Sequence, residues 1–252
     1  MVRYYCSGID INNAFGHGLG EMFKEDLKDM KRIVFIPGGP HKVGKAISKS
    51  VPEFIDHFKK VGIEFDEAVI ITPDTDKEDA KAYVEGASFI MLMGGDPFEQ
   101  KKMCEKLGIL DSIKNSKAVI LGFSAGAMLM SKYSIITPCS DRYPDFHIED
   151  GLNLDGISIY PHNNTDSCEY PESLDVGGEV YQKNDLIKVA SEYGNYYLLQ
   201  DYTADGVNFD ISLIRVKDGK MEFYTENNGK IWEATADGIK LEYPEVLKQR
   251  KL

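Results

Sequence analysis

Residues 118–131 read AVILGFSAGAMLMS, and this stretch decides the fold. The apolar run 118–121 predicts a buried strand, and the residues from Ala127 onward predict a helix. A Gly-x-Ser-x-Gly sequence between a strand and a helix is typical of a nucleophile elbow, a sharp turn that exposes its central serine. Ser124 is therefore the candidate nucleophile, and the free N–H groups at the start of the helix would favour an oxyanion beside it.

The N-terminal half repeats this order of strand and helix. Apolar runs alternate with segments whose apolar residues recur every three or four positions, which predicts a parallel sheet with crossover helices. The strands are expected at Val2–Tyr5, Arg32–Ile36, Ala68–Ile71, Phe89–Met93 and Ala118–Leu121. Two capping boxes, Ser50 with Glu53 and Thr75 with Glu78, predict helix starts.

The C-terminal half loses the helical rhythm. Two segments rich in Pro, Asp, Asn, Ser and Gly, Thr137–Asp155 and Asn163–Gly178, predict long surface loops around a strand at Gly156–Tyr160. Further strands are expected at Tyr196–Gln200, Ile211–Val216, Met221–Tyr224 and Ile231–Ala234, with hairpin turns at 217–220 and 227–229. These strands predict an antiparallel extension of a doubly wound, mostly parallel sheet. Nothing marks a second domain, so residues 1–252 are interpreted as one α/β domain.

The composition limits the partners of the chain. A formal net charge of −12 disfavours nucleic acid and anionic lipid, and no apolar run is long enough to span a membrane. The N-terminus does not resemble a secretion signal, so a cytoplasmic location is expected. The cysteines, Cys6, Cys104, Cys139 and Cys168, show no paired spacing, which predicts neither disulfides nor a metal site. A homodimer is compatible with such a chain.

A second glycine turn follows the strand Phe89–Met93, in the sequence Gly94-Gly95-Asp96-Pro97. In a parallel sheet this turn and the serine turn meet at the same edge, where ligands bind. Because paired glycines allow close approach of the backbone, the N–H groups of Gly95 and Ala125 are the candidate oxyanion donors. A plain connecting turn is the alternative.

A serine nucleophile needs a base and an orienting acid. The histidines are His17, His41, His57, His147 and His162. We interpret His162 as the base because it directly ends an apolar strand. The alternative is a histidine whose hydrogen bonds only stabilise its own loop. Asp201 follows the strand Tyr196–Gln200, which we expect beside the strand that carries His162; a turn-forming aspartate is the alternative. Rival acids in this part of the chain are Asp166, Glu169, Glu172 and Glu192.

The order Ser124, His162, Asp201 differs from that of α/β-hydrolases, in which the histidine comes last. At these residues the chain resembles the dipeptidase E and cyanophycinase family of serine peptidases. The resemblance rests on Gly94-Gly95-Asp96, the elbow 122–127, Pro161-His162 and Asp201 before Thr203-Ala204, and it covers about residues 2–210.

The resemblance implies a three-layer fold, flavodoxin-like and related to class I glutamine amidotransferases, and no metal or organic cofactor. It assigns Ser124 as nucleophile, His162 as base and Asp201 as orienting acid. Two departures stand out. Asp96 replaces the asparagine that often follows the glycine pair, and no arginine for an acidic substrate side chain occurs between Arg142 and Arg215. The substrate-binding residues are therefore left open.

The leading hypothesis is a serine-type peptidase that hydrolyses small peptides through an acyl-enzyme, as an exopeptidase or dipeptidase would. Two alternatives remain at this point. One is a catalytically silent module of the same fold that binds a small ligand, and the other is an esterase or amidase that acts on a non-peptide substrate.

Overall fold

The computed structural model describes residues 1–9, 15, 18–138, 143–165, 167–176, 179–202, 211–225, 229–243 and 245–246. Within these residues a main sheet of eight strands has the order β16-β13-β12-β1-β5-β4-β2-β3. The strands are β1 (Val2–Cys6), β2 (Arg32–Gly38), β3 (Glu67–Ile70), β4 (Phe89–Gly95), β5 (Val119–Phe123), β12 (Ser212–Lys217), β13 (Lys220–Thr225) and β16 (Glu245–Val246). The block from β1 to β3 is parallel throughout, as predicted.

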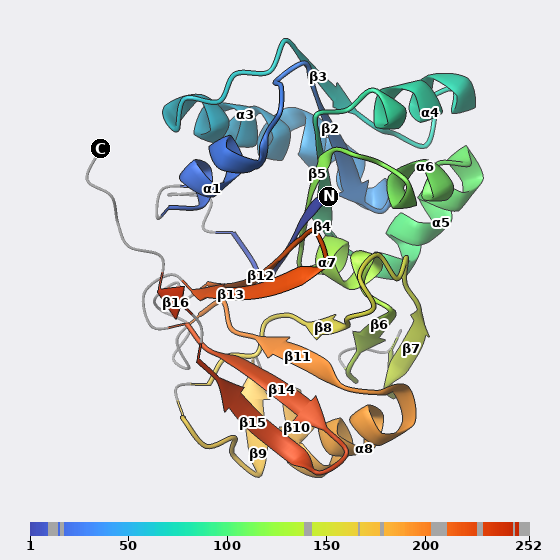
Figure 1. The fold of residues 1–252 in the computed structure, drawn as a ribbon. Helices are drawn as coiled ribbons and strands as arrows, with labels where there is room; N and C mark the ends of the chain where they lie inside the picture. Colours follow the sequence, from blue (N-terminus) through green and yellow to red (C-terminus); the bar gives the residue numbers. More distant parts are fainter. Residues whose placement is uncertain are drawn as a thin grey trace.

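Helices cover both faces of the main sheet, which confirms the three-layer α/β fold (Figure 1). Alternate residues of β2 divide between the two cores: Val34 and Ile36 face one, Ile33 and Phe35 the other. One face packs against α1 (Leu19–Asp26) and α3 (Val51–Lys60). The other packs against α4 (Lys77–Glu85), α5 (Pro97–Leu107), α6 (Leu110–Lys114) and α7 (Ala125–Met130).

Both predicted helix starts need correction. Ser50 has helical φ and ψ (−66° and −41°), because the chain is already helical from Pro40 through α2 (Val43–Lys45) and a π-helical turn, Ala46–Ser50. Such a turn suits the neighbouring Pro52, which has no N–H to donate. The cap of α4 is Asp76, whose carboxylate accepts the N–H groups of Glu78 and Asp79. Thr75 instead accepts the N–H of Thr72.

The antiparallel extension is confirmed only in part. β12 pairs antiparallel with β1, and the β12–β13 turn has positive φ at Asp218 and Gly219, as a tight hairpin requires. The expected hairpin from β13 to the strand Ile231–Ala234 is wrong, because that strand belongs to another sheet; most of its expected turn, 227–229, lies outside the described residues.

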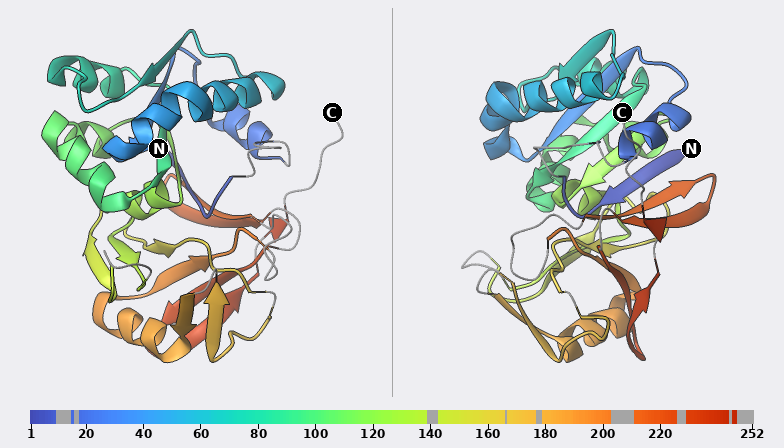
Figure 2. Two further views of the ribbon diagram at one scale, coloured as in Figure 1. Left: turned by 180° about the vertical axis from the view of Figure 1, so that it is seen from behind. Right: turned by 90° about the vertical axis from the view of Figure 1, so that its left-hand side faces the viewer.

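A second sheet lies beside the main one, with the order β15-β14-β11-β8 (Figures 1 and 2). Its strands are β8 (Ile159–Tyr160), β11 (Tyr196–Leu199), β14 (Ile231–Thr235) and β15 (Gly238–Glu242). Ile159, Leu199 and Ile231 join the core under α7, whereas Tyr196 and Trp232 pack on the other face with α8 (Lys183–Tyr193). The second sheet is therefore bound to the main sheet through a shared apolar core.

The two expected surface loops contain short strands that the sequence analysis missed. β7 (His147–Asp150) pairs with β6 (Tyr133–Ile136), and β9 (Ser173–Val176) pairs with β10 (Glu179–Gln182). β7 is polar and partly exposed, so its sequence carries no apolar alternation to signal a strand.

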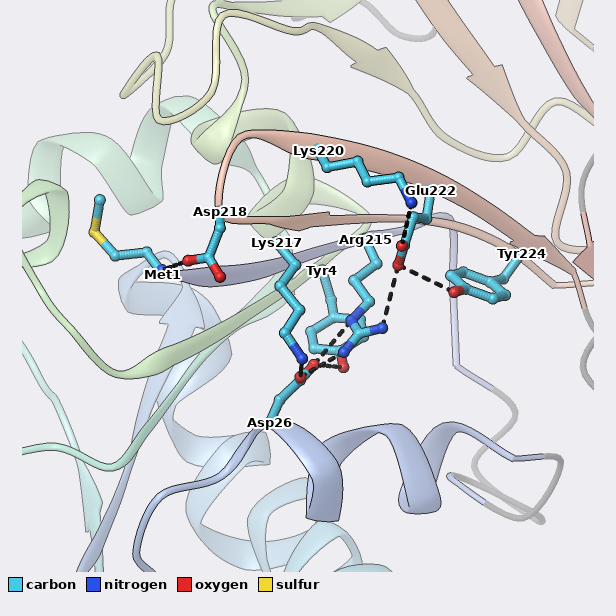
Figure 3. A network of polar contacts seen from close by, with 9 residues as sticks. All are labelled: Met1, Tyr4, Asp26, Arg215, Lys217, Asp218, Lys220, Glu222 and Tyr224. Carbon is cyan, nitrogen blue, oxygen red and sulfur yellow. Dashed lines mark hydrogen bonds and ion pairs between the residues drawn. The ribbon is translucent and has the colours of Figure 1, made fainter.

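A buried ion cluster ties α1 to the β12–β13 hairpin (Figure 3). The carboxylate of Asp26, at the end of α1, accepts from Arg215 Nε at 2.9 Å, from Lys217 Nζ at 2.8 Å and from the hydroxyl of Tyr4. Arg215 also pairs with Glu222 at 3.2 Å. Burial by itself raises the pKa of Asp26, but the hydrogen bonds from Arg215, Lys217 and Tyr4 outweigh it and hold that pKa below its ordinary value.

None of the helices in the described part of the chain combines the length and the apolar character that crossing a bilayer requires.

Candidate active site

Ser124 stands on the turn between β5 and α7, at the carboxyl end of the main sheet. Its φ of 51° and ψ of −120° are strained for a residue with a side chain. The turn is this tight because α7 lies directly on β4: a Cβ on Gly126 would stand 1.9 Å from the carbonyl oxygen of Leu92. Only glycine fits there, which explains the second glycine of the elbow.

His162 reaches Ser124 from the second sheet, two residues after the end of β8. Its Nε2 lies 2.8 Å from Ser124 Oγ, and its own φ of 61° is also positive. The imidazole is about half exposed (48%), whereas the partner of its other nitrogen, Asp201, is buried (3%).

Asp201 follows β11, which runs parallel to β8, so the predicted placement of this aspartate beside the strand of His162 is confirmed. The Nδ1 of His162 lies 2.5 Å from Asp201 Oδ2. Because a carboxylate only accepts, the ring proton belongs on Nδ1, which leaves Nε2 free to accept the proton of Ser124. The structure thus brings Ser124, His162 and Asp201 into one chain of hydrogen bonds.

The rival residues lie elsewhere. His57 is buried in α3, His41 is exposed, and His147 contacts Glu149 at 3.0 Å. The rival acids Glu169, Glu172 and Glu192 are all exposed. His17 and Asp166 fall outside the described residues.

The glycine turn after β4 lies against Ser124. A Cβ on Gly94 would stand 3.4 Å from the Cβ of Ser124, and Gly95 has a φ of 153° and packs on the backbone of Gly38. Ala125 is the first residue of α7, so its N–H has no partner within the helix. Asp96 turns away from this space: it caps α5 through the N–H of Phe98 and accepts from Tyr143 at 2.9 Å.

A pocket of about 380 Å³ opens above Ser124 and His162. It lies at the carboxyl ends of the neighbouring strands β2 and β4, where the chain leaves β2 toward β3 and leaves β4 in the opposite direction, toward β5. Ligands usually bind at such a point in doubly wound sheets. Apolar side chains such as Phe54, Met93 and Phe123 line part of it.

Lys42 and Lys45 also line the pocket, and neither forms an ion pair with another described residue. These lysines belong to no motif that the sequence displays, although the Pro37-Gly38-Gly39-Pro40 turn before them marks a sheet-edge loop. The described arginines, Arg3, Arg32 and Arg215, do not line the pocket, and each is paired with a carboxylate elsewhere.

A family model described as Peptidase family S51 matches residues 10–192, which is most of the chain. The chain belongs to peptidase family S51. The resemblance to dipeptidase E and cyanophycinase is thereby confirmed, and this S51 member is a serine-type peptidase, a hydrolase. No curated protein sequence matches the chain significantly.

Two crystal structures have the same fold as this S51 peptidase. One is of a protein assigned as peptidase E from Listeria monocytogenes EGD-e, with 16% identity, a TM-score of 0.57 and coverage of 88% of this chain and 96% of that chain. The other is of a peptidase from an acI-B1 Actinobacterium, with 14% identity, a TM-score of 0.58 and coverage of 96% and 94%. At these identities the likeness establishes the fold alone.

No group of three or more His, Cys, Asp or Glu side chains in the described ranges is arranged to hold a metal ion.

Proposed function

We propose that this S51 peptidase hydrolyses small peptides through an acyl-enzyme on Ser124. The observation that supports this most directly is the hydrogen-bond chain from Ser124 Oγ through His162 to Asp201, at 2.8 Å and 2.5 Å. These are the contacts that a serine, its general base and an orienting acid need.

In the proposed reaction Ser124 Oγ attacks the carbonyl carbon of the scissile peptide bond, and His162 Nε2 takes the hydroxyl proton. The N–H groups of Gly95 and Ala125 stabilise the negative oxygen of the tetrahedral intermediate. The C–N bond then breaks, and His162 gives its proton to the leaving amine. Water attacks the acyl-enzyme by the same route in reverse, and Asp201 stabilises the imidazolium in both halves of the cycle.

The pocket supports a small substrate. Its volume of about 380 Å³ is at the lower end of the range for ligand sites, enough for a short peptide. Lys42 and Lys45 supply positive charge in a chain that is otherwise strongly acidic, so a carboxylate of a small peptide is the group we expect them to meet.

Covalent labelling tests the proposal. A fluorophosphonate probe should modify Ser124 in the wild-type chain, and the adduct should be mapped to that residue by mass spectrometry. The Ser124→Ala variant should not be labelled and should lose at least about 10⁴-fold in turnover of dipeptides. An unlabelled Ser124 with no turnover would support the silent binding module instead. Turnover of short esters but not of dipeptides or aminoacyl arylamides would support the esterase alternative.

A further inference from the structure

The three proposed catalytic side chains come from two sheets. Ser124 follows β5 of the main sheet, whereas His162 and Asp201 follow β8 and β11 of the second sheet. Catalytic groups must be held to within about 0.5 Å of the productive geometry. The alignment of the two sheets at this point therefore matters as much as the structure of either sheet.

The end of β1 touches both sides of this junction. The carbonyl oxygen of Cys6 accepts the N–H of Ser124 at 3.1 Å, which fixes the backbone of the nucleophile. The next residue, Ser7, donates its N–H to the carbonyl of Ser212 in β12 at 3.1 Å. Its hydroxyl lies nearest to the carbonyl oxygen of Gln200, to which it donates at 2.5 Å, and it also lies 3.2 Å from the carbonyl oxygen of Ser212.

The carbonyl of Gln200 belongs to the peptide unit that carries Asp201. It accepts from Ser7 Oγ and also from the N–H of Ser212, at 2.8 Å. The N–H of the same peptide unit donates to Asn164 Oδ1 at 3.3 Å, in the loop that carries His162. This peptide unit is therefore held by the main sheet on one side and by the His162 loop on the other.

The cluster is buried and close-packed. Ser7, Gln200 and Ser212 are fully buried, and Asp201 is 2% exposed. Gly8, the residue after Ser7, lies so near the acid that a Cβ there would stand 2.9 Å from Asp201 Oδ2. Leaving a buried polar group without its hydrogen-bond partner is costly, so the hydrogen bond of the Ser7 hydroxyl constrains the peptide strongly.

We infer that Ser7 is a positioning residue for catalysis: its hydroxyl fixes the Gln200–Asp201 peptide and so sets the acid, and through it His162, in register with Ser124. The inference rests on the proposed function, because it assigns Ser7 no role except through Asp201.

Ser212 provides the matched control. Its side-chain hydroxyl is equally buried in the same cluster, but it donates to the carbonyl of Lys230 at 2.8 Å and not to the Gln200–Asp201 peptide. Ser212→Ala removes a hydroxyl hydrogen bond from the same cluster and leaves the backbone N–H of Ser212 on Gln200. A purely structural role of Ser7 predicts the same behaviour for Ser7→Ala and Ser212→Ala.

The test is a double-mutant cycle with four chains: wild type, Ser7→Ala, Asp201→Ala and the double variant, with Ser212→Ala beside them. Steady-state kinetics on one activated substrate give kcat and KM, fluorophosphonate labelling gives the reactivity of Ser124, and urea unfolding gives stability. We expect Ser7→Ala to lower kcat and the labelling rate by about 10- to 100-fold with KM within about twofold, the scale of loss for a small misplacement. In the Asp201→Ala background the same change should have no further effect.

The outcomes separate the inference from the proposed function. The inference is supported if Ser7→Ala lowers kcat only in chains that retain Asp201, and if Ser212→Ala is destabilised but active. The inference is overturned, and the proposed function is not, if Ser7→Ala and Ser212→Ala have equal kinetics. The same holds if Ser7→Ala lowers kcat as much in the Asp201→Ala chain as in the wild-type chain. Wild-type turnover in Asp201→Ala overturns the proposed function and the inference together. If Ser7→Ala does not fold, Ser7→Cys, which fills the same space with a weaker donor, takes its place with the same expected pattern.

Discussion

Ser124 and His162, which share a 2.8 Å hydrogen bond, both have positive φ, 51° and 61°. A residue with a side chain costs about 1–3 kcal/mol in such a sparsely populated backbone region. Two of the five described non-glycine residues with positive φ are thus the two that share this hydrogen bond.

Replacing Ser124 by glycine should make this strain measurable. Ser124→Gly and Ser124→Ala both remove the hydroxyl, but only glycine adopts φ of 51° without a steric penalty. We expect Ser124→Gly to be more stable than Ser124→Ala by about 1 kcal/mol in urea unfolding, with both variants inactive. Equal stabilities would show that the turn carries no strain at this residue.

The acid should be Asp201 and not a neighbouring carboxylate. Asp201→Asn should lower kcat by about 10²–10⁴-fold, because the imidazolium loses its partner and the tautomer is no longer fixed. Glu192→Gln, on the exposed face of α8, is the control and should keep wild-type kinetics. The reverse result, an inactive Glu192 variant beside an active Asp201 variant, would contradict the assignment.

A methyl group on Gly8 should meet Asp201 before either of the other two residues. Gly8→Ala places a Cβ 2.9 Å from Asp201 Oδ2 and 3.3 Å from its Cβ, so the carboxylate must move. We expect kcat to fall by about 10-fold or more. The control is Gly44→Ala, at a helical position where a Cβ meets nothing within 4 Å, which should leave kinetics unchanged. Unchanged turnover in Gly8→Ala would show that the acid tolerates displacement.

The pocket lysines should act on substrate binding. Replacing Lys42 or Lys45 by methionine should raise KM for a dipeptide with a free carboxylate by about 3- to 10-fold and leave KM for the corresponding dipeptide amide unchanged. Lys49→Met is the control, because this exposed lysine of the same helical segment does not line the pocket and faces Glu53. Equal KM changes for acid and amide would rule out a carboxylate contact.

The Asp26 cluster should contribute to acid stability. Because its folded pKa lies below its unfolded value of about 3.9, Asp26 stabilises the fold above that pH, and the contribution disappears as pH falls through the folded pKa. Asp26→Asn should cost about 3–5 kcal/mol near neutral pH, since Arg215 is left buried without its main partner. The penalty should shrink below about pH 4. Asp218→Asn, which removes an exposed ion pair with the N-terminus, should change stability little.

The parts of this structure that the sequence predicts are those with strong local signals. The five parallel strands are apolar runs that end in turn residues, and strand ends fix where Ser124, His162 and Asp201 can stand. Parallel strands of one sheet bring their carboxyl ends to one edge, which places the Gly94-Gly95 turn beside Ser124 in the main sheet and His162 beside Asp201 in the second sheet. That the two sheets meet at Ser124 has no local signal in the sequence.

The remainder depends on contacts between distant residues. β8 has only two residues, too few for a sequence pattern. β14 has the same alternation of buried and partly exposed residues whether it joins the main sheet or the second one. Its partner is decided by the shared core around Ile231, which no local pattern reveals. Ser7 shows the same limit, because its sequence neighbours give no sign that its hydroxyl reaches a residue 193 positions away.

Because the proposed active site is divided between two sheets, turnover should report how those sheets are aligned. Trp232, the one tryptophan of the chain, is buried in the outer core of the second sheet, so its fluorescence follows that core and not the junction near Ser124. Mild heating or low urea that displaces one sheet relative to the other by about an ångström should abolish activity. The tryptophan emission and the far-ultraviolet circular dichroism should stay native under the same conditions. Inactivation should therefore precede unfolding, and the gap between the two curves measures the strength of the interface between the sheets.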